Sequence, residues 1–349
     1  MPCRPRGLRP PARVSRVVSG VSRRGGVGAR AGPPTWHGGA VTTAERVLAY
    51  GGGWLDRAGA LRADPARLDA MLADPTSVVL PLWRDRCLVD GDGPVRLTAD
   101  RASLVRSAAD ATVFLGLDGD TAVFAVDLSA LPEQSAVEMA GAARAVDVRA
   151  LVGRLDASDA AVQAYARGVL HWHRQQRYCG TCGAAAVSDG GGHVRTCTGG
   201  ECGRLLFPRI EPAIIVLVVA PDEPGVPERC LLARHAGARE DAYSTLAGFV
   251  EVGESLEDAV RREMAEEAGI TVTGLAYQGS QAWPFPAGLM VGFRATAGSD
   301  EVRVDGVELL EARWFTRAEL RERVASGRPL GRVDSIDHQL LGDWLAGGD

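Results

Sequence analysis

Residues 248–270 read GFVEVGESLEDAVRREMAEEAGI, and this stretch decides the fold of the C-terminal part of the chain. Its apolar residues recur at helical spacing, which predicts an amphipathic helix near Leu256–Ala268. Ser255 has a side chain that can cap the first turn, and Gly269 suits the C-cap position. The stretch therefore predicts a loop, a helix and a second loop.

Three carboxylates, Glu263, Glu266 and Glu267, are spaced so that they project near one face of this helix. Like charges this close repel one another and raise each other's pKa, and a bound divalent cation removes that penalty. Hard oxygen ligands select Mg²⁺ or Mn²⁺. The alternative is a solvated acidic helix face, but Gly248 and Gly253 frame a tight loop that such a face does not require.

Every fixed position of the pattern Gx5Ex7REUxEExGU, in which U is a bulky apolar residue, is present in this stretch. The pattern resembles the box of the Nudix hydrolases, which cut diphosphates with the help of metal ions. We expect Glu263 and Glu267 to be metal ligands, and Glu266 to be a third ligand or the base that activates water. Arg262 is expected to orient a carboxylate, with Glu254 as one candidate. The alternative for Arg262 is an ordinary surface ion pair.

Four cysteines in residues 177–208 have the spacing of a metal site. The segment Cys179-Gly-Thr-Cys182 is followed, after fourteen intervening residues, by Cys197-Thr-Gly-Gly-Glu-Cys202. Paired knuckles of this kind hold thiolates in the tetrahedral geometry that Zn²⁺ prefers. We therefore expect a structural zinc ribbon, in which four protein ligands leave no open coordination position. A redox role for Cys179 and Cys182 is the alternative.

A stiff aromatic loop is predicted at residues 280–290, which read SQAWPFPAGLM. Pro284 and Pro286 alternate with the rings of Trp283 and Phe285 and restrict the backbone. Flat apolar surfaces of this kind suit stacking on a nucleobase. The alternative is a rigid loop that packs in a core.

Together these segments resemble the NADH pyrophosphatase (NAD⁺ diphosphatase) family, which combines an N-terminal domain, a four-cysteine zinc ribbon, the Nudix box and the motif SQPWPFPxSLM. The resemblance spans roughly residues 75–345. It implies hydrolysis of NAD(H) to NMN(H) and AMP, the same cleavage at the NAD cap of a 5′-capped RNA, and a homodimer. It also implies that Glu308 and the backbone carbonyl of Ala247 are further metal ligands. The substrate-binding residues that it implies are Phe207, Gln281, Trp283, Pro284, Phe285 and Pro286.

The chain departs from the family pattern at four positions. Ala282 replaces the usual proline, Gly288 replaces the usual serine, and Phe207 stands where the family often has tyrosine. The change at Gly288 removes a hydroxyl that can bond to a phosphate or ribose. Asp337 stands in place of an alanine, and its carboxylate either adds charge near the site or faces solvent.

The composition divides the chain into a tail and three folded regions. Residues 1–40 are rich in Arg, Gly and Pro and contain no Asp or Glu, which predicts a disordered tail. An organelle transit peptide and a misassigned start codon are the alternatives. We expect an N-terminal α+β domain at 41–176, the zinc ribbon at 177–208 and the Nudix domain at 209–349. The fold class is α/β (α+β), and the Nudix domain is a mixed-sheet α/β/α sandwich.

Local patterns place the elements within these regions. In the N-terminal domain they predict a strand at Ser77–Leu82, a hairpin turning at Asp118-Gly119-Asp120 within Ala111–Leu128, and helices near Ser135–Leu151 and Ala157–Gln176. In the C-terminal domain they predict strands at Ala213–Ala220, Cys230–His235, Gly274–Gln278 and Met290–Ala297, and a helix near Asp334–Leu345.

The bulk properties exclude some classes of function. The net charge of −5 gives no overall electrostatic reason to favour nucleic acid. No apolar run approaches 18 residues, so we predict no membrane span or membrane partner. Seven cysteines, of which four are clustered, argue against a secreted disulfide framework and favour a reducing cytoplasm.

Two other functions compete with NAD(H) hydrolysis. The first is the same chemistry on ADP-ribose, a dinucleoside polyphosphate or NAD-capped RNA, which the changes at Ala282 and Gly288 leave open. The second is a non-enzymatic nucleotide or nucleic-acid binding module. The complete set of carboxylates, Glu263, Glu266, Glu267 and Glu308, argues against that second hypothesis.

Overall fold

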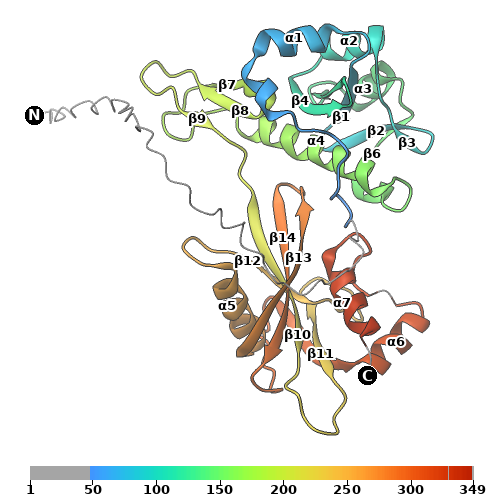
Figure 1. Cartoon of the computed structure of the whole chain (residues 1–349), viewed down its shortest axis with the longest axis vertical. Coiled ribbons are helices and arrows are strands. Elements are labelled where there is room, and N and C mark those ends of the chain that lie inside the picture. The colour runs from blue at the N-terminus through green and yellow to red at the C-terminus, as the bar shows by residue number, and fades with distance from the viewer. Residues whose placement is uncertain (1–47, 329, 348–349) are drawn as a thin grey trace, which may run out of the picture. The chain divides into compact units, whose positions relative to one another are not determined.

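The computed structural model describes residues 48–328 and 330–347, so the predicted tail at 1–40 lies outside the described residues. Strands form three sheets in this part of the chain (Figure 1). All described residues belong to one compact unit. Within these ranges, none of the helices combines the length and the apolar character of a transmembrane span.

The C-terminal sheet has six strands in the order β13-β14-β10-β11-β15, and β12 pairs with β10. The strands are β10 (Glu211–Val219), β11 (Arg229–His235), β12 (Leu246–Phe249), β13 (Val272–Trp283), β14 (Gly288–Ala297) and β15 (Leu309–Thr316). Strand β10 runs parallel to β14 and antiparallel to β11 and β12. The predicted mixed-sheet α/β class is confirmed.

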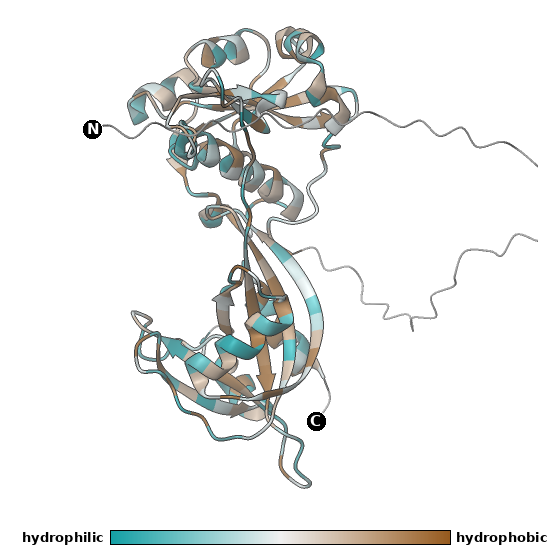
Figure 2. Cartoon of the chain, turned by 90° about the vertical axis from the view of Figure 1, so that its left-hand side faces the viewer, coloured by the Kyte–Doolittle hydropathy of each residue, from teal (hydrophilic) through white to brown (hydrophobic). Residues whose placement is uncertain are grey.

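Strand β10 lies between two cores because its side chains alternate between the faces of the sheet. Ile214 and Val216 pack with helix α5 (Leu256–Ala268), whereas Ile215 and Leu217 pack on the other face with helix α7 (Ile336–Ala346). Helix α6 (Arg317–Ala325) precedes α7. Figure 2 shows hydrophobic strands behind α5, whose outward face is largely hydrophilic. The sheet therefore has a helix layer on each face.

The N-terminal sheet also has six strands, in the order β3-β2-β1-β5-β4, with β6 on β2. Its strands are β1 (Val78–Trp83), β2 (Arg86–Asp90), β3 (Gly93–Pro94), β4 (Ala111–Asp118), β5 (Thr121–Asp127) and β6 (Arg144–Val146). The accompanying helices are α1 (Pro65–Ala73), α2 (Ala99–Ser107), α3 (Glu133–Ala140) and α4 (Ala157–Gln175), with short 3₁₀ turns at Gly59–Ala63, Val148–Leu151 and Gly190–Gly192. The predicted first strand, hairpin and long helix are confirmed.

The helix predicted near Ser135–Leu151 is wrong in length. Helix α3 ends at Ala140, because Gly141 adopts a left-handed φ of 64° and its N–H bonds back to the carbonyls of Val137 and Glu138. The chain then forms strand β6 and a 3₁₀ turn. A glycine C-cap therefore stops this helix well before the predicted end.

The cysteine module is a separate three-stranded sheet of β7 (Ala186–Asp189), β8 (Val194–Cys197) and β9 (Leu205–Leu206). It lies in sequence between the two larger sheets, as the predicted order of regions requires. The predicted domain limits at 176/177 and 208/209 remain predictions.

Strands β13 and β14 are longer than the sequence predicts, and this changes the predicted aromatic loop. They pair from Val272↔Ala297 as far as Trp283↔Gly288, so most of residues 280–290 belongs to a β-hairpin. Only residues 284–287 form its tip. The hairpin holds the motif at the end of the sheet, where β10 begins.

Candidate active site

Helix α5 begins and ends where the sequence predicts. The hydroxyl of Ser255 accepts a hydrogen bond from the N–H of Asp258 at 3.1 Å, and Gly269 closes the helix with a φ of 68°. These caps fix which side chains of the helix face the sheet. Helix α5 and the loop before β15 then bring carboxylates together, beside the backbone at the end of β12.

Glu267 is the most buried of these carboxylates, with 5% of its surface exposed. Its Oε2 atom is buried without a hydrogen-bond partner among the described residues. Burial, followed by the charges of Glu263, Glu308 and Asp305, raises the pKa of Glu267 to about 8. A buried carboxylate oxygen without a partner costs free energy unless a proton or a cation binds it. The residue therefore fits a site for a hard cation.

Glu263 lies directly over the backbone of Gly248. A Cβ atom at Gly248 would lie 2.0 Å from the carboxyl carbon of Glu263, so only glycine leaves room for this side chain. Burial raises the pKa of Glu263, whereas its ion pair with Arg262 acts against that shift. Ala247, the predicted carbonyl ligand, precedes Gly248 in β12. Glu263 and Ala247 thus lie on adjoining elements.

Glu308 reaches the same group from the loop before β15. Its side chain lies near enough to Glu267 that its charge helps to raise the pKa of Glu267. Asp305, which the sequence reasoning missed, holds this loop by accepting the backbone N–H groups of Val307, Glu308 and Leu309 at 2.9–3.2 Å. The sequence Asp305-Gly306 is a turn signal of this kind.

Glu266 lies apart from the buried pair. Its side chain is 62% exposed and bonds to Arg262 at 3.1 Å. Its charge contributes to the raised pKa of Glu263, so it remains within electrostatic range. The carboxylate oxygens of Glu263, Glu267 and Glu308 do not all lie within 4.8 Å of one another, whereas the sulfurs of the four cysteines do.

Arg262 orients carboxylates, as the sequence predicts. Its Nε and Nη2 donate to the two oxygens of Glu254 at 2.7 and 3.0 Å, and Nη2 also donates to the carbonyl of Phe249 at 2.9 Å. These bonds lower the pKa of Glu254 to about 2. A bidentate guanidinium pair thus connects the loop before α5 to the helix.

The four cysteines meet at one point. The sulfurs of Cys179 and Cys202 are 3.9 Å apart, and those of Cys182 and Cys197 are 3.4 Å apart. A tetrahedron with metal–sulfur bonds of about 2.3 Å has sulfurs about 3.8 Å apart. The N–H of Gly199 points at the sulfur of Cys197 at 3.4 Å. The arrangement fits a zinc ion.

The two rings of the predicted stacking loop pack against the protein itself. Trp283 and Phe285 lie 5.3 Å apart between ring centroids, and both rings contact Tyr50, at 5.9 and 4.9 Å. The guanidinium groups of Arg149 and Arg167 lie 5.0 and 4.9 Å from the centroid of Phe285. This packing matches the alternative interpretation of a rigid core-packing loop for these two rings.

Gln281 is buried, and backbone groups engage its amide. Its Nε2 donates to the carbonyls of Asp334 and Ala49 at 2.7 and 3.1 Å, and its Oε1 accepts the N–H of Ile336 at 2.8 Å. These bonds connect strand β13 to the start of α7. Gln281 therefore holds the hairpin in place.

The remaining predicted residues point elsewhere. Pro284 and Pro286 line a cavity between the hairpin tip and α4, and Phe207 is 58% exposed. Asp337 does not face solvent: it is buried, and its Oδ1 accepts the hydroxyl and the N–H of Thr245 at 2.7 and 3.2 Å. The prediction that Asp337 faces solvent is therefore wrong, and the alternative that it adds charge near the site stays a prediction.

Comparisons with family models match the two larger sheets. A model described as an NADH pyrophosphatase-like rudimentary NUDIX domain matches residues 76–172. A model described as a NUDIX domain matches residues 210–331. Both six-stranded sheets therefore lie within matched segments.

Several curated relatives are similar to this chain. The NAD-capped RNA hydrolase NudC of Mycobacterium tuberculosis is 40% identical over 281 residues, which cover 78% of this chain and 85% of that protein. The human NAD-capped RNA hydrolase NUDT12 is 39% identical over 204 residues, covering 55% of this chain and 43% of that protein. Nudix hydrolase 19, chloroplastic, of Arabidopsis thaliana is 36% identical over 231 residues, covering 62% and 51%. The chain thus spans less than half the length of NUDT12.

Proposed function

The chain belongs to the NADH pyrophosphatase family of Nudix hydrolases, and on that premise we propose that it hydrolyses the diphosphate bond of NAD(H) to NMN(H) and AMP. Water adds to one phosphorus, the bridging P–O bond breaks, and a proton is released. The same cleavage at an NAD cap would leave a 5′-monophosphate RNA. The observation that carries the proposal is the buried, unpartnered carboxylate oxygen of Glu267 beside Glu263 and Glu308.

We propose that Glu263, Glu267, Glu308 and the carbonyl of Ala247 hold Mg²⁺ or Mn²⁺. Such ions neutralise charge on the diphosphate and lower the pKa of attacking water. Glu266 is exposed beside them, and its proposed role is that of a third ligand or of the base that takes the proton from water.

The proposed role of Arg262 is to orient Glu254 and Glu263, which it contacts at 2.7–3.0 Å. Gln281, Trp283 and Phe285 are proposed to hold the hairpin tip, so that the other face of the tip, with Pro284 and Pro286, meets substrate.

The four cysteines are proposed to hold a structural Zn²⁺, which the sulfur spacing and the bond from Gly199 support. The backbone N–H groups of Thr181 and Cys182 lower the pKa of Cys179 to about 6, whereas burial and the neighbouring cysteines raise the pKa of Cys197 to about 12, so bound zinc would have to displace the proton of Cys197. Zinc analysis of the purified protein should give one ion per chain. A value far below one would contradict the ribbon.

Assembly and location are proposed from resemblance and chemistry. We propose a homodimer, which light scattering during gel filtration would measure. Exposed apolar side chains on and after the cysteine module, Leu205, Phe207 and Ile210, support an interface there. The cysteines of the described residues are free thiols, which supports a reducing cytoplasmic location.

One kinetic experiment tests the function. Purified protein is incubated with NADH, NAD⁺, ADP-ribose and NAD-capped RNA in Mg²⁺ or Mn²⁺, and kcat/KM is compared. We expect release of AMP from NADH or NAD⁺, or of 5′-monophosphate RNA from the cap. Preference for ADP-ribose would support the second candidate function, which the changes at Ala282 and Gly288 leave open. Absence of cleavage of every substrate would overturn both.

A further inference from the structure

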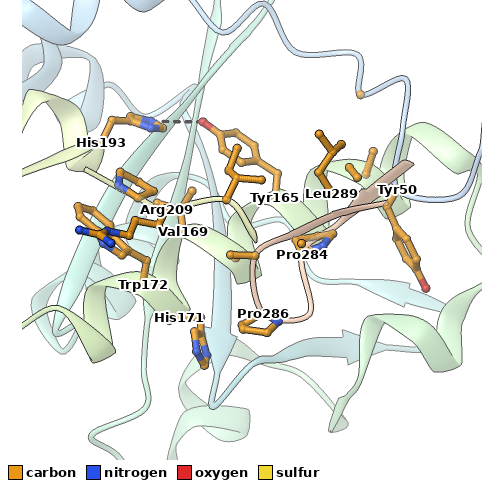
Figure 3. Close-up of a pocket in the computed structure, with 18 of the residues that line it drawn as sticks. Tyr50, Tyr165, Val169, His171, Trp172, His193, Arg209, Pro284, Pro286 and Leu289 are labelled. Atoms are coloured by element: carbon orange, nitrogen blue, oxygen red, sulfur yellow. Dashed lines mark hydrogen bonds between the residues drawn. The ribbon is translucent and has the colours of Figure 1, made fainter. Parts of the chain in front are cut away.

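A cavity of about 710 Å³ lies between the tip of the β13–β14 hairpin and helix α4 (Figure 3). Gly168 makes the close approach possible, because a Cβ atom there would lie 3.1 Å from Pro284 Cβ. Arg167 of α4 also donates a hydrogen bond to the carbonyl of Pro284. The walls therefore come from α4 and from residues between 50 and 62 on one side, and from the start of β10 and the hairpin tip on the other.

The cavity has flat, apolar walls. Tyr165 and Trp172 project from α4, and Pro284 and Pro286 face them from the hairpin tip (Figure 3). The ring of His193 stacks on Tyr165 with 6.1 Å between centroids. Burial lowers the pKa of His193 to about 4, so this ring is neutral. Such walls suit a heteroaromatic ring.

Three arginines line the same cavity, and the guanidinium group of one of them, Arg57, lies 3.4 Å from the centroid of the Tyr165 ring. Arg57, Arg62 and Arg209 line it, and none of the three forms an ion pair with a carboxylate of residues 48–328 or 330–347. The Nε of Arg62 is buried without a hydrogen-bond partner. Among the described residues, Glu211 is the only acidic one in the lining. In a chain of net charge −5, this arrangement favours an anion at the cavity.

Strand β10 connects the cavity to the carboxylates. Glu211 lines the cavity, and Ile214, three residues along, pairs with Gly248, over which Glu263 lies. A strand rises about 3.3 Å per residue, so the separation along β10 is about 10 Å. This distance is comparable with the length of a mononucleotide.

We propose that this cavity binds a nucleoside 5′-monophosphate unit, with its base against Trp172, Pro284 and Pro286 and its phosphate among the arginines. The aromatic walls and the unpaired guanidinium groups select a ligand that is both flat and anionic. The choice of a nucleotide rests on the proposed function. Its source is either one half of the dinucleotide that is cleaved, or the nucleotide that follows the cap in a capped RNA.

The binding test uses full-length protein, calorimetry, and AMP and NMN as probes, without added Mg²⁺ or Mn²⁺. Neither probe contains a diphosphate bond, so binding is measured without turnover. The test variant is Arg57→Gln/Arg209→Gln, in which both substituted side chains are exposed. The control Arg67→Gln/Arg101→Gln removes the same charge from exposed positions on α1 and α2. We expect one of the probes to bind the wild type at one site per chain.

Losing two charge-assisted contacts should raise the Kd of that probe at least about tenfold in the test variant. The control should stay within about twofold, because it leaves the cavity untouched. If neither probe binds the wild type, or if the test variant binds as tightly as the control, the proposal is wrong. Thermal melting checks that the test variant is folded, and Arg209→Gln alone replaces it if it is not.

Kinetics separate the two sources. If the cavity holds half of the dinucleotide, the test variant raises the KM for NADH and leaves kcat within about twofold. If it holds the nucleotide after a cap, NADH kinetics stay unchanged and only the KM for NAD-capped RNA rises. Failure of the wild type to cleave any substrate would instead contradict the proposed function, and the binding result would stand by itself.

Discussion

The two six-stranded sheets share one plan of connections. In each, the first strand (β1 or β10) lies inside the sheet, antiparallel to the second strand (β2 or β11). Each first strand is also parallel to the second strand of a later hairpin, β4–β5 or β13–β14. A helix precedes the hairpin in both cases, α2 or α5. The family descriptions, rudimentary NUDIX and NUDIX, agree with this likeness.

The sheets differ in whether an arginine pairs with their buried carboxylate. Helix α2 has one acidic residue, Asp100, where α5 has five. Asp127, at the end of β5, is fully buried, but Arg174 pairs with it at 2.8 Å. Glu267 is almost as buried, and no arginine of residues 48–328 or 330–347 pairs with it. One arrangement thus supplies its own cation, whereas the other has no such partner among the described residues.

The largest expected effect is on catalysis. Glu267→Gln removes the buried charge, and we expect kcat for NADH to fall about 1,000-fold, because loss of a metal ligand removes several kcal/mol of transition-state stabilisation. Asp100→Asn on α2 is the matched control and should leave kcat unchanged. Steady-state kinetics in Mg²⁺ or Mn²⁺ measure both. Full activity of Glu267→Gln would refute the metal assignment.

The next effect tests the paired carboxylate of the N-terminal sheet. Arg174→Gln leaves Asp127 buried without its cation, so the free energy of unfolding should fall by about 3–5 kcal/mol. Denaturant titration measures this change. The double variant Arg174→Gln/Asp127→Asn should recover part of the loss, because no unpaired charge remains. Equal stability of the single and double variants would show that burying the Asp127 charge without Arg174 costs no free energy.

A smaller effect tests the approach of Glu263 to the backbone. Gly248→Ala places a methyl group where the Glu263 carboxylate lies, so the side chain must move, and we expect kcat to fall about tenfold. The control is Gly93→Ala in the N-terminal sheet, because an added methyl group there meets open space. Gly91 also has open space around it, but its positive φ makes it less suitable. An unchanged kcat for Gly248→Ala would mean that Glu263 need not lie over this residue.

The sequence predicts features that depend on neighbours along the chain. Ser255 and Gly269 cap α5, so its two ends are predictable to the residue. The hairpin around Gly119 and the convergence of the cysteines also follow from local spacing. The helix predicted near Ser135–Leu151 is wrong in length, because the prediction followed the helical pattern and did not use Gly141 as a signal for the end of the helix.

Other features depend on contacts between distant segments, which spacing does not encode. Trp283 and Phe285 look like an exposed stacking pair until Tyr50 and Arg149 are brought against them from more than 130 residues away. Asp337 likewise has a partner that is distant in the sequence, because Thr245 donates a hydrogen bond to its carboxylate. The sequence therefore identifies the carboxylates, but only the fold shows which of them is buried and unpaired.

The smallest expected effect is on stability and follows from the pKa of Glu267. In the folded state this pKa is raised from 4.5 to about 8, so the folded protein keeps a proton that the unfolded chain releases. Stability of protein free of Mg²⁺ and Mn²⁺ should therefore fall as the pH rises from about 5 to about 8. We expect the Glu267 contribution to lower Tm by at least about 2–4 °C over that range. Glu267→Gln should remove this contribution, whereas Glu257→Gln, at an exposed position on the same helix, should keep it.

Added Mn²⁺ should flatten the dependence of Tm on pH in the wild type, because the cation replaces the proton. An equal slope in all three proteins would place the titrating group elsewhere, and would mean that the open carboxylate of the Nudix sheet is as well compensated as the paired one of the N-terminal sheet.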